Sequence, residues 1–322
     1  MSRTPREQLV HFLSDMYSIE QQALAQLGPA PKVVSVPLMK DEFHRHYLET
    51  QQQAEMVGKR LEANDGSPSR IKDAVMRLGG KGFLLFAVAM PETPGRLVDH
   101  AYAYEAMEWA GYEMLMRFAE RAGDHETVAT AETIRDQERT MMHRLEQDFG
   151  AAQQLSHKST TQEDLPKHVI KHLSEVHAIE GQAIQLFSKA EGIAGNEELT
   201  AIYHEELEEV RRHAELVEKR LEALDSGASK IRDIAMRAGG INWGLFFQAQ
   251  SDTPAKFAAF LYAVLHLAIG GYELLKWTAI RVDDRETQQL CERIVSEKRA
   301  IAERLAEHFD AAVDATLEAV AA

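Results

Sequence analysis

Acidic side chains stand in the middle of four apolar, helix-periodic stripes in the first half of the chain. The donors on these stripes are Glu20, His46, Glu49, Glu105, Glu108 and Glu138. A buried carboxylate is costly on its own, and several that face one another repel unless protons or cations lie between them. Carboxylate oxygens and one imidazole nitrogen are the donors that a pair of hard-to-borderline divalent ions prefers. The pattern therefore predicts a two-metal site.

Each donor alone also has a simpler interpretation. A single glutamate on an amphipathic helix is more often a boundary residue whose carboxylate reaches solvent. Taken alone, Glu108 is consistent with a residue that contacts a metal ligand and not the metal itself. Taken alone, His46 is consistent with a residue that orients Glu49. Tyr17 and Tyr112 lie on the same stripes and fit core packing better than hydrogen bonds to the acids. One acid on each of four helices, at matching depth, favours the metal site over these alternatives.

The chain of 322 residues repeats itself with a period of 160. AEMVGKRLEA at 54–63 aligns with AELVEKRLEA at 214–223, and GYEML at 111–115 aligns with GYELL at 271–275. The two copies align without a gap, so each serves as a control for the other. A buried polar residue that occurs in only one copy is not required by the fold.

The second copy keeps only part of the donor set. The polar residues on its corresponding stripes are Glu180, Glu206, Glu209, His213 and Lys298. Leu265 and Ala268 stand where the first copy has Glu105 and Glu108. The sequence of the second copy therefore predicts a degenerate site, in a bundle whose role is to pair with the first bundle or to serve as a scaffold.

Lys298 is in register with Glu138. We expect its ammonium to occupy the place of the metal and to pair with Glu180 and Glu209. A buried ion pair is only marginally stabilising, but removing one partner from it costs about 3–5 kcal/mol. Weak binding of one ion by Glu209 and His213 is the alternative.

Helical periodicity runs through almost the whole chain and predicts four long helices in each copy. The expected helices cover about 5–27, 38–63, 95–121, 125–150, 165–190, 195–223, 255–281 and 285–318. In each copy a long crossover with an extra short helix, at about 69–78 and 229–238, joins two short-loop hairpins. This order describes an all-α fold of two tandem ferritin-like four-helix bundles.

The domain boundaries follow from the repeat and from composition. We expect one bundle with the metal site at 1–152 and a second with the degenerate site at 165–322. The polar stretch 153–164, QQLSHKSTTQED, is the expected linker.

Charge and cysteine content narrow the class of protein further. The net charge is −15 without a basic block, which argues against nucleic acid as a partner. The single cysteine, Cys291, excludes an internal disulfide and fits a reducing compartment. The N-terminus lacks an apolar signal core, and we expect no apolar run that approaches a membrane span. A cytoplasmic protein without a membrane partner is the prediction.

Three motifs carry a resemblance to a known family. FHRHYLETQQQ at 43–53 resembles F-x-x-H-x-x-E-T, and YEAMEWAGY at 104–112 resembles E-H-Y-E-x-A-x-Y. DQERTMMHRL at 136–145 resembles a third motif of the family, with Gln137 in place of its first acid. These motifs are similar to those of the bacterial stress-associated ferritin-like proteins of the YciF type. The resemblance implies dimers of bundles, so the two copies are expected to form a pseudo-two-fold dimer within one chain, with a homodimer as the alternative.

The predicted function is that of a di-iron or di-manganese carboxylate protein of the stress response. It would hold two divalent ions, with iron favoured over manganese or zinc, and would oxidise Fe(II) or reduce peroxide with O₂ or peroxide as a partner. The alternative is a non-catalytic stress or scaffold protein with a vestigial or single-metal site. A third possibility is a binder of apolar ligands through the runs at 82–90 and 241–250.

Overall fold

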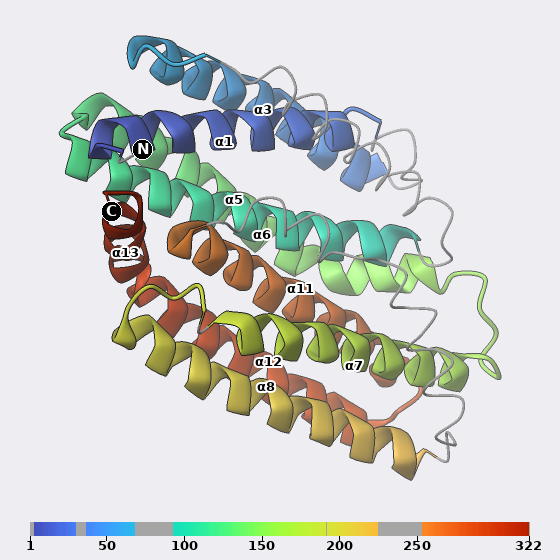
Figure 1. Cartoon of the computed structure of the whole chain (residues 1–322). Helices are drawn as coiled ribbons and strands as arrows, with labels where there is room; N and C mark the ends of the chain where they lie inside the picture. Colours follow the sequence, from blue (N-terminus) through green and yellow to red (C-terminus); the bar gives the residue numbers. More distant parts are fainter. Residues whose placement is uncertain (1–2, 30–36, 68–92, 191, 225–252, 322) are drawn as a thin grey trace.

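The structure is a computed structural model, and it describes residues 3–29, 37–67, 93–190, 192–224 and 253–321. These residues form two tandem helical bundles, which confirms the expected all-α fold (Figure 1). The first bundle contains α1 (Pro5–Leu27), α3 (Pro37–Ala63), α5 (Thr93–Ala122) and α6 (His125–Ser156). The second contains α7 (Leu165–Ala190), α8 (Glu197–Ala223), α11 (Pro254–Arg281), α12 (Arg285–Glu307) and α13 (Phe309–Ala321). The expected short helices at 69–78 and 229–238 and the apolar runs at 82–90 and 241–250 lie outside the described residues.

Side-chain caps define where several helices begin. At the start of α1, the Glu7 amide donates to Thr4 Oγ1 over 3.2 Å and the Thr4 amide donates to the Glu7 carboxylate over 2.7 Å, with Pro5 in the first helical position. Asp124 and its counterpart Asp284 cap α6 and α12, each accepting a backbone N–H three residues on at 3.1 Å. The two copies therefore use the same start signal for their last long helix.

The ends of the last helices differ from the expectation. α6 continues to Ser156, so the first four residues of the expected linker are helical. Gln153 is buried there, and this tertiary packing outweighs the polar composition of the segment. The expected helix at 285–318 is interrupted at His308, which separates α12 from α13. α13 packs against α5, where Asp310 lies 2.9 Å from Arg121.

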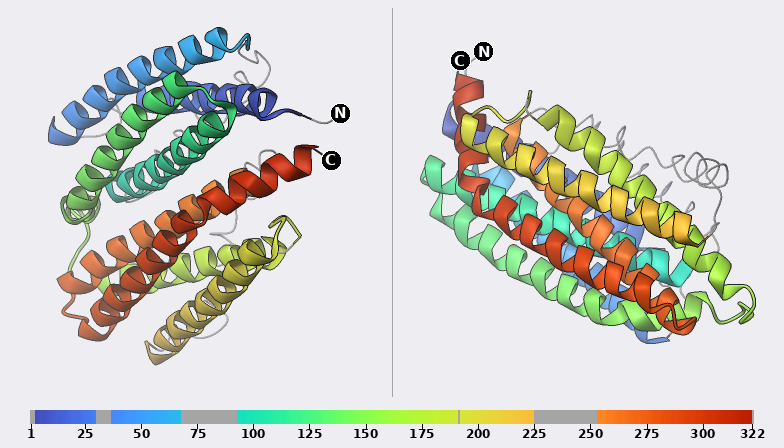
Figure 2. Two further views of the ribbon diagram at one scale, coloured as in Figure 1. Left: turned by 90° about the vertical axis from the view of Figure 1, so that its left-hand side faces the viewer. Right: turned by 90° about the horizontal axis from the view of Figure 1, so that it is seen from below.

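α5 and α11 lie side by side at the centre of the molecule and form the seam between the two bundles (Figures 1 and 2). Among the ion pairs that join the two bundles, two are related by the 160-residue register. Arg96 contacts Glu175, and Lys256 Nζ lies 2.7 Å from Asp15 Oδ2. Arg96 aligns with Lys256, and Asp15 aligns with Glu175. The two ion pairs therefore join equivalent positions of the two copies, as an approximate two-fold axis between the bundles requires.

α11 corrects the expectation that no apolar run approaches a membrane span. Among the described helices it is the one long and apolar enough to cross a membrane, but 94% of its apolar window is buried inside the protein. It contacts α5, α6, α7, α12 and α13. A helix enclosed on all sides needs no polar face, so burial accounts for its composition.

Candidate metal site

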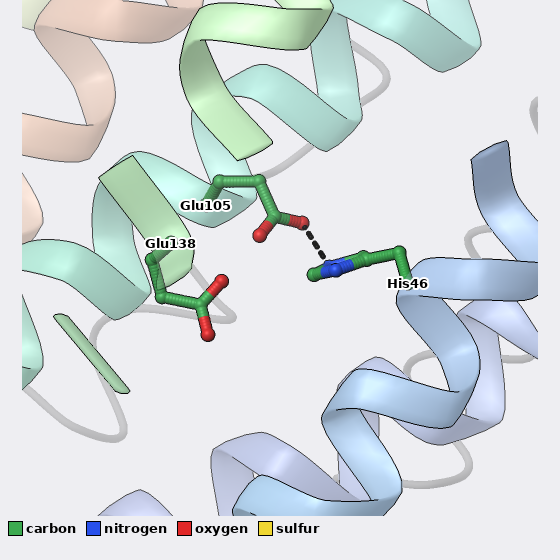
Figure 3. A group of neighbouring side chains, drawn as sticks. All are labelled: His46, Glu105 and Glu138. Atoms are coloured by element: carbon green, nitrogen blue, oxygen red, sulfur yellow. Dashed lines mark hydrogen bonds and ion pairs between the residues drawn. The ribbon is translucent and has the colours of Figure 1, made fainter. Parts of the chain in front are cut away.

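Three donors from three helices meet in the core of the first bundle (Figure 3). His46 comes from α3, Glu105 from α5 and Glu138 from α6. One ligand atom of each lies within 4.8 Å of the other two, and all three side chains are buried. His46 Nε2 is 2.9 Å from Glu105 Oε1. This group has the donor chemistry to hold a metal ion.

Glu20 and Glu108 add two further buried carboxylates to the first bundle. Tyr112 donates a hydrogen bond to Glu20 Oε1, so this tyrosine contacts an acid and is not only core packing. One oxygen of each of four acids is buried without a hydrogen-bond partner among the described residues. These atoms are Glu20 Oε2, Glu105 Oε2, Glu108 Oε1 and Glu138 Oε2. Such orphaned oxygens are costly unless a cation satisfies them, so the residues present fit a metal.

Burial dominates the protonation of these groups. It raises the pKa of Glu20 to about 8, although the hydrogen bond from Tyr112 opposes the shift. Burial and neighbouring carboxylates raise the pKa values of Glu108 and Glu138 well above the ordinary value. Burial alone would lower the pKa of His46, but the carboxylates of Glu105 and Glu49 outweigh it and raise that pKa to about 10. The raised pKa values of Glu20, Glu108 and Glu138 favour their protonated forms until a cation replaces the protons.

Glu49 lies at the outer edge of this site. Its side chain is 28% exposed, and its Oε2 is 3.6 Å from His46 Nδ1, the ring nitrogen that does not face Glu105. At 100° per residue Glu49 points about 60° away from His46, whereas Gln53 points within about 20° of it. The structure therefore places Glu49 behind the imidazole, where it orients His46, and not among the converging oxygens.

Two residues that were not among the predicted donors contact the acids or lie close to them. Gln53 Nε2 donates to Glu138 Oε1 over 2.5 Å, and the buried Tyr104 donates to the Ile19 carbonyl over 3.0 Å. Burial raises the pKa of the Tyr104 hydroxyl well above its ordinary value. The neighbouring carboxylates raise it further, and that of Glu108 has the largest effect among them. The register pointed to Gln53, because its counterpart in the second copy is His213.

In the second bundle a lysine occupies the centre. Lys298 Nζ lies 2.9 Å from Glu180 Oε2, and both side chains are fully buried. Tyr272 donates to the other oxygen of Glu180 over 2.7 Å. Both oxygens of Glu180 therefore have a partner, whereas Glu20 at the same position in the first bundle has an orphaned oxygen.

The expected pairing of Lys298 with Glu209 is wrong. Glu209 is 34% exposed and lies 3.6 Å from Arg212 and 3.7 Å from Arg304. It occupies the same edge position on its helix as Glu49, which keeps it away from the bundle axis. Glu206 is the buried acid of that helix, and it lies 3.0 Å from Arg304.

His213 is also directed away from Glu209. Its Nε2 lies 2.8 Å from Glu297 Oε2, and burial together with Lys298 lowers its pKa to about 4. The second bundle thus pairs these residues with one another and with arginines, although Glu206 Oε2 and His213 Nδ1 are buried without a hydrogen-bond partner among the described residues. This arrangement differs from the convergence of Glu209 and His213 that a single-ion site would need.

Both repeats match one known protein family. Residues 4–157 and 164–318 each match a domain of unknown function named DUF892. The chain belongs to this family. DUF892 is the YciF-type family whose motifs the sequence resembles, and it occurs here as two tandem repeats. No solved structure matches the chain. Both DUF892 repeats keep a buried glutamate with a tyrosine partner, but the first alone has acids in register with Leu265 and Ala268.

Proposed function

We propose that the first DUF892 repeat is a ferritin-like carboxylate bundle that binds two divalent metal ions. Iron is favoured, with manganese or zinc as alternatives, because oxygen donors predominate and one imidazole joins them. The observation that carries this proposal is the set of orphaned carboxylate oxygens in the first bundle. In the second bundle the corresponding positions hold a paired glutamate, two apolar residues and a lysine. The fold therefore does not need the acids, so their retention supports a role in binding.

Five residues would hold the ions: Glu20, His46, Glu105, Glu108 and Glu138. When bound, a ferrous pair supplies electrons for reducing O₂ or peroxide. The protein's own groups prepare the donors. Tyr112 and Gln53 each donate to one oxygen of an acid and leave the other oxygen unpaired. Fe(II) oxidation and peroxide reduction are the two activities that this donor set supports.

Aerobic addition of Fe(II) to the purified protein tests the proposal. We expect about two iron ions per chain by elemental analysis, together with O₂ uptake and a rise in near-ultraviolet absorption. The variant with Glu105→Ala and Glu138→Ala should lose both the iron and the O₂ uptake. About four ions per chain, or none after growth with added metal, would contradict a site confined to the first repeat.

The second candidate is a non-catalytic stress or scaffold protein. It is favoured by one observation, that the second repeat forms a bundle with Lys298 at its centre. The same titration separates the two candidates. Bound metal without O₂ or peroxide consumption would support the scaffold, and consumption lost in the Glu105→Ala and Glu138→Ala variant would support the enzyme.

We also propose that the chain is an internal pseudo-dimer that works in the cytoplasm without a nucleic-acid or membrane partner. The twice-made ion pair across the seam supports the pseudo-dimer. The net charge of −15 supports the absence of a nucleic-acid partner. A single chain in solution by light scattering would agree with this proposal, and a stable homodimer would contradict it.

A further inference from the structure

A second buried polar cluster lies at one end of the seam, outside the carboxylate site. Gln153 of α6 is at its centre. The Gln153 Nε2 atom is 2.8 Å from His157 Nε2, 2.9 Å from His172 Nε2 and 2.8 Å from Thr278 Oγ1. All four side chains are buried. They come from the end of α6, from α7 and from α11, so the cluster ties the connection between the repeats to the second bundle.

The opposite end of the seam shows what the fold itself requires at this place. The 160-residue register pairs His172, Thr278, Gln153 and His157 with Phe12, Phe118, Val313 and Leu317. The rings of Phe12 and Phe118 pack with their centroids 5.0 Å apart. Apolar side chains therefore stand in place of these four residues, and the buried Gln8 stands in place of the neighbouring His168. The polar cluster is an addition to the fold, and it calls for a separate chemical reason.

Two imidazoles, those of His157 and His172, face the Gln153 amide, and a third, that of His168, packs edge-on against His157. His168 and His172 are four residues apart on α7 and share one face, which is the spacing that lets a helix chelate a zinc ion. The His157 ring centroid lies 4.7 Å from that of His168 and 6.1 Å from that of His172. His172 Nδ1 is 3.0 Å from Glu175 Oε2. A carboxylate behind one ring nitrogen directs the other toward the cluster, as it does for metal-binding histidines.

The Gln153 amide satisfies the cluster incompletely. Its nitrogen carries two hydrogens but faces three groups, and Thr278 Oγ1 already donates to the Leu274 carbonyl over 2.9 Å. Its oxygen, Oε1, is buried without a hydrogen-bond partner among the described residues. If the Gln153 amide is turned by 180°, so that its oxygen and nitrogen exchange places, the nitrogen is the atom left without a partner. An amide at the point where two imidazole nitrogens converge is therefore in a place that suits a cation.

We propose that His157, His168 and His172 form a binding site for a divalent ion of the zinc class, with the Gln153 amide moving aside. Imidazole nitrogens suit borderline ions such as Zn²⁺, whereas the oxygen-rich site of the first bundle suits harder ones. The half-buried His168 gives the ion a route from solvent. A bound ion would fasten the end of α6 to α7.

Titration of the full-length protein with Zn²⁺ and Co²⁺ tests this proposal. The background is the Glu105→Ala and Glu138→Ala variant, so the result does not depend on the carboxylate site. We expect one tightly held ion per chain and, with Co²⁺, a visible absorption spectrum of nitrogen coordination. His168→Gln and His172→Phe introduce the residues at the opposite end of the seam, Gln8 and Phe12. Each should abolish the Co²⁺ spectrum and the tight binding of Zn²⁺.

The matched control is His143→Gln, which removes a histidine whose side chain is 70% exposed on α6. This variant should keep the ion and the Co²⁺ spectrum. If His172→Phe alters the helical circular dichroism, the half-buried His168→Gln decides the result. Uptake that is unchanged in His168→Gln, or no tight Zn²⁺ binding before substitution, would overturn the proposal.

Discussion

Position 138 and its counterpart 298 set the charge at the centre of each bundle. Glu138 adds a carboxylate to three other buried acids, whereas Lys298 places an ammonium 2.9 Å from the one acid that remains, Glu180. In the first bundle the unpaired negative charge must be met by protons or metal. In the second bundle a covalently attached cation meets it.

Lys298→Met should strongly destabilise the protein. It leaves Glu180 buried with Tyr272 as its remaining partner, and removing one member of a buried pair costs about 3–5 kcal/mol. Chemical denaturation followed by circular dichroism measures this change. Adding Glu180→Gln to Lys298→Met removes the stranded charge and should recover most of the loss. Equal stability of the single and double variants would contradict the ion-pair account.

The metal-free protein should lose stability as the pH rises. The pKa of Glu20 is raised from 4.5 to about 8 in the folded state, so its contribution is complete below about pH 4.5 and is lost as the pH rises through about 8. The pKa of His46, raised from 6.5 to about 10, acts in the same direction at higher pH. Each proton contributes a slope of up to about 1.4 kcal/mol per pH unit.

Urea unfolding of the metal-free protein between about pH 5 and 9 measures this slope. Glu20→Gln removes one titrating group and should make the slope shallower, and bound metal should flatten it because metal competes with protons. A free energy of unfolding that increases with pH over this range in the metal-free protein would contradict the assignment.

At the scale of helices, a close approach of α5 and α11 depends on Gly270. A Cβ atom there would lie 2.0 Å from Asp99 Oδ1 and 3.1 Å from Phe149 Cζ. We therefore expect Gly270→Ala to destabilise the protein by about 1–3 kcal/mol. The counterparts of Gly270 and Asp99 are Ala110 and Ala259. Adding Asp99→Ala should consequently relieve the clash.

Gly181 in α7 is the matched control for this measurement. A Cβ atom at this glycine meets nothing within 4 Å, so Gly181→Ala should stabilise α7 by about 0.5–1 kcal/mol through helix propensity. Melting temperatures of the variants compare the two sites. If both alanines had the same effect, the close approach at Gly270 would not control the packing of the seam.

Helical periodicity was enough to predict most of the helices. α1 and α7 have the expected bounds, because Gly28 follows one and each has a regular apolar stripe. The periodicity could not predict the break at His308 or the helical end of α6. Both depend on contacts with the other bundle, and these join residues far apart in the sequence.

The inward acids were recognisable for the same reason, but their partners were not. Glu105 and Glu138 lie at the centre of their stripes, and the structure brings them together with His46. Glu49 lies at the edge of its stripe, where a difference of about 60° decides between the core and the surface. The hydrogen bond from Gln53 to Glu138 depends on how α3 and α6 are rotated relative to each other. The apolar stripe of one helix carries no information about that rotation.

At the scale of the whole molecule, the seam makes the two bundles depend on each other. Trp109 of α5 stacks on Tyr262 of α11 with their ring centroids 4.9 Å apart, and α11 is buried almost along its whole length. Near the chain ends, the Arg3 amide donates to the Val320 carbonyl over 2.8 Å. Separating the repeats would expose a large apolar surface on both sides.

Fragments 1–157 and 158–322 should therefore not remain monomeric alone. We expect each to aggregate or self-associate, and we expect the two to form a one-to-one complex when they are produced together. Size-exclusion chromatography with light scattering distinguishes these states. A soluble, helical monomer of either fragment would show that the seam is not needed for folding.

The two register-related ion pairs, Arg96 with Glu175 and Lys256 with Asp15, have a consequence for how this protein could change in evolution. In a dimer of identical chains every mutation at the interface appears twice, so both ends of the interface must change together. Here one end uses arginine with glutamate and the other uses lysine with aspartate. Two repeats in one chain are free of this constraint. A single substitution can now alter one end alone, and features that occur once per molecule, such as the histidine cluster, become possible.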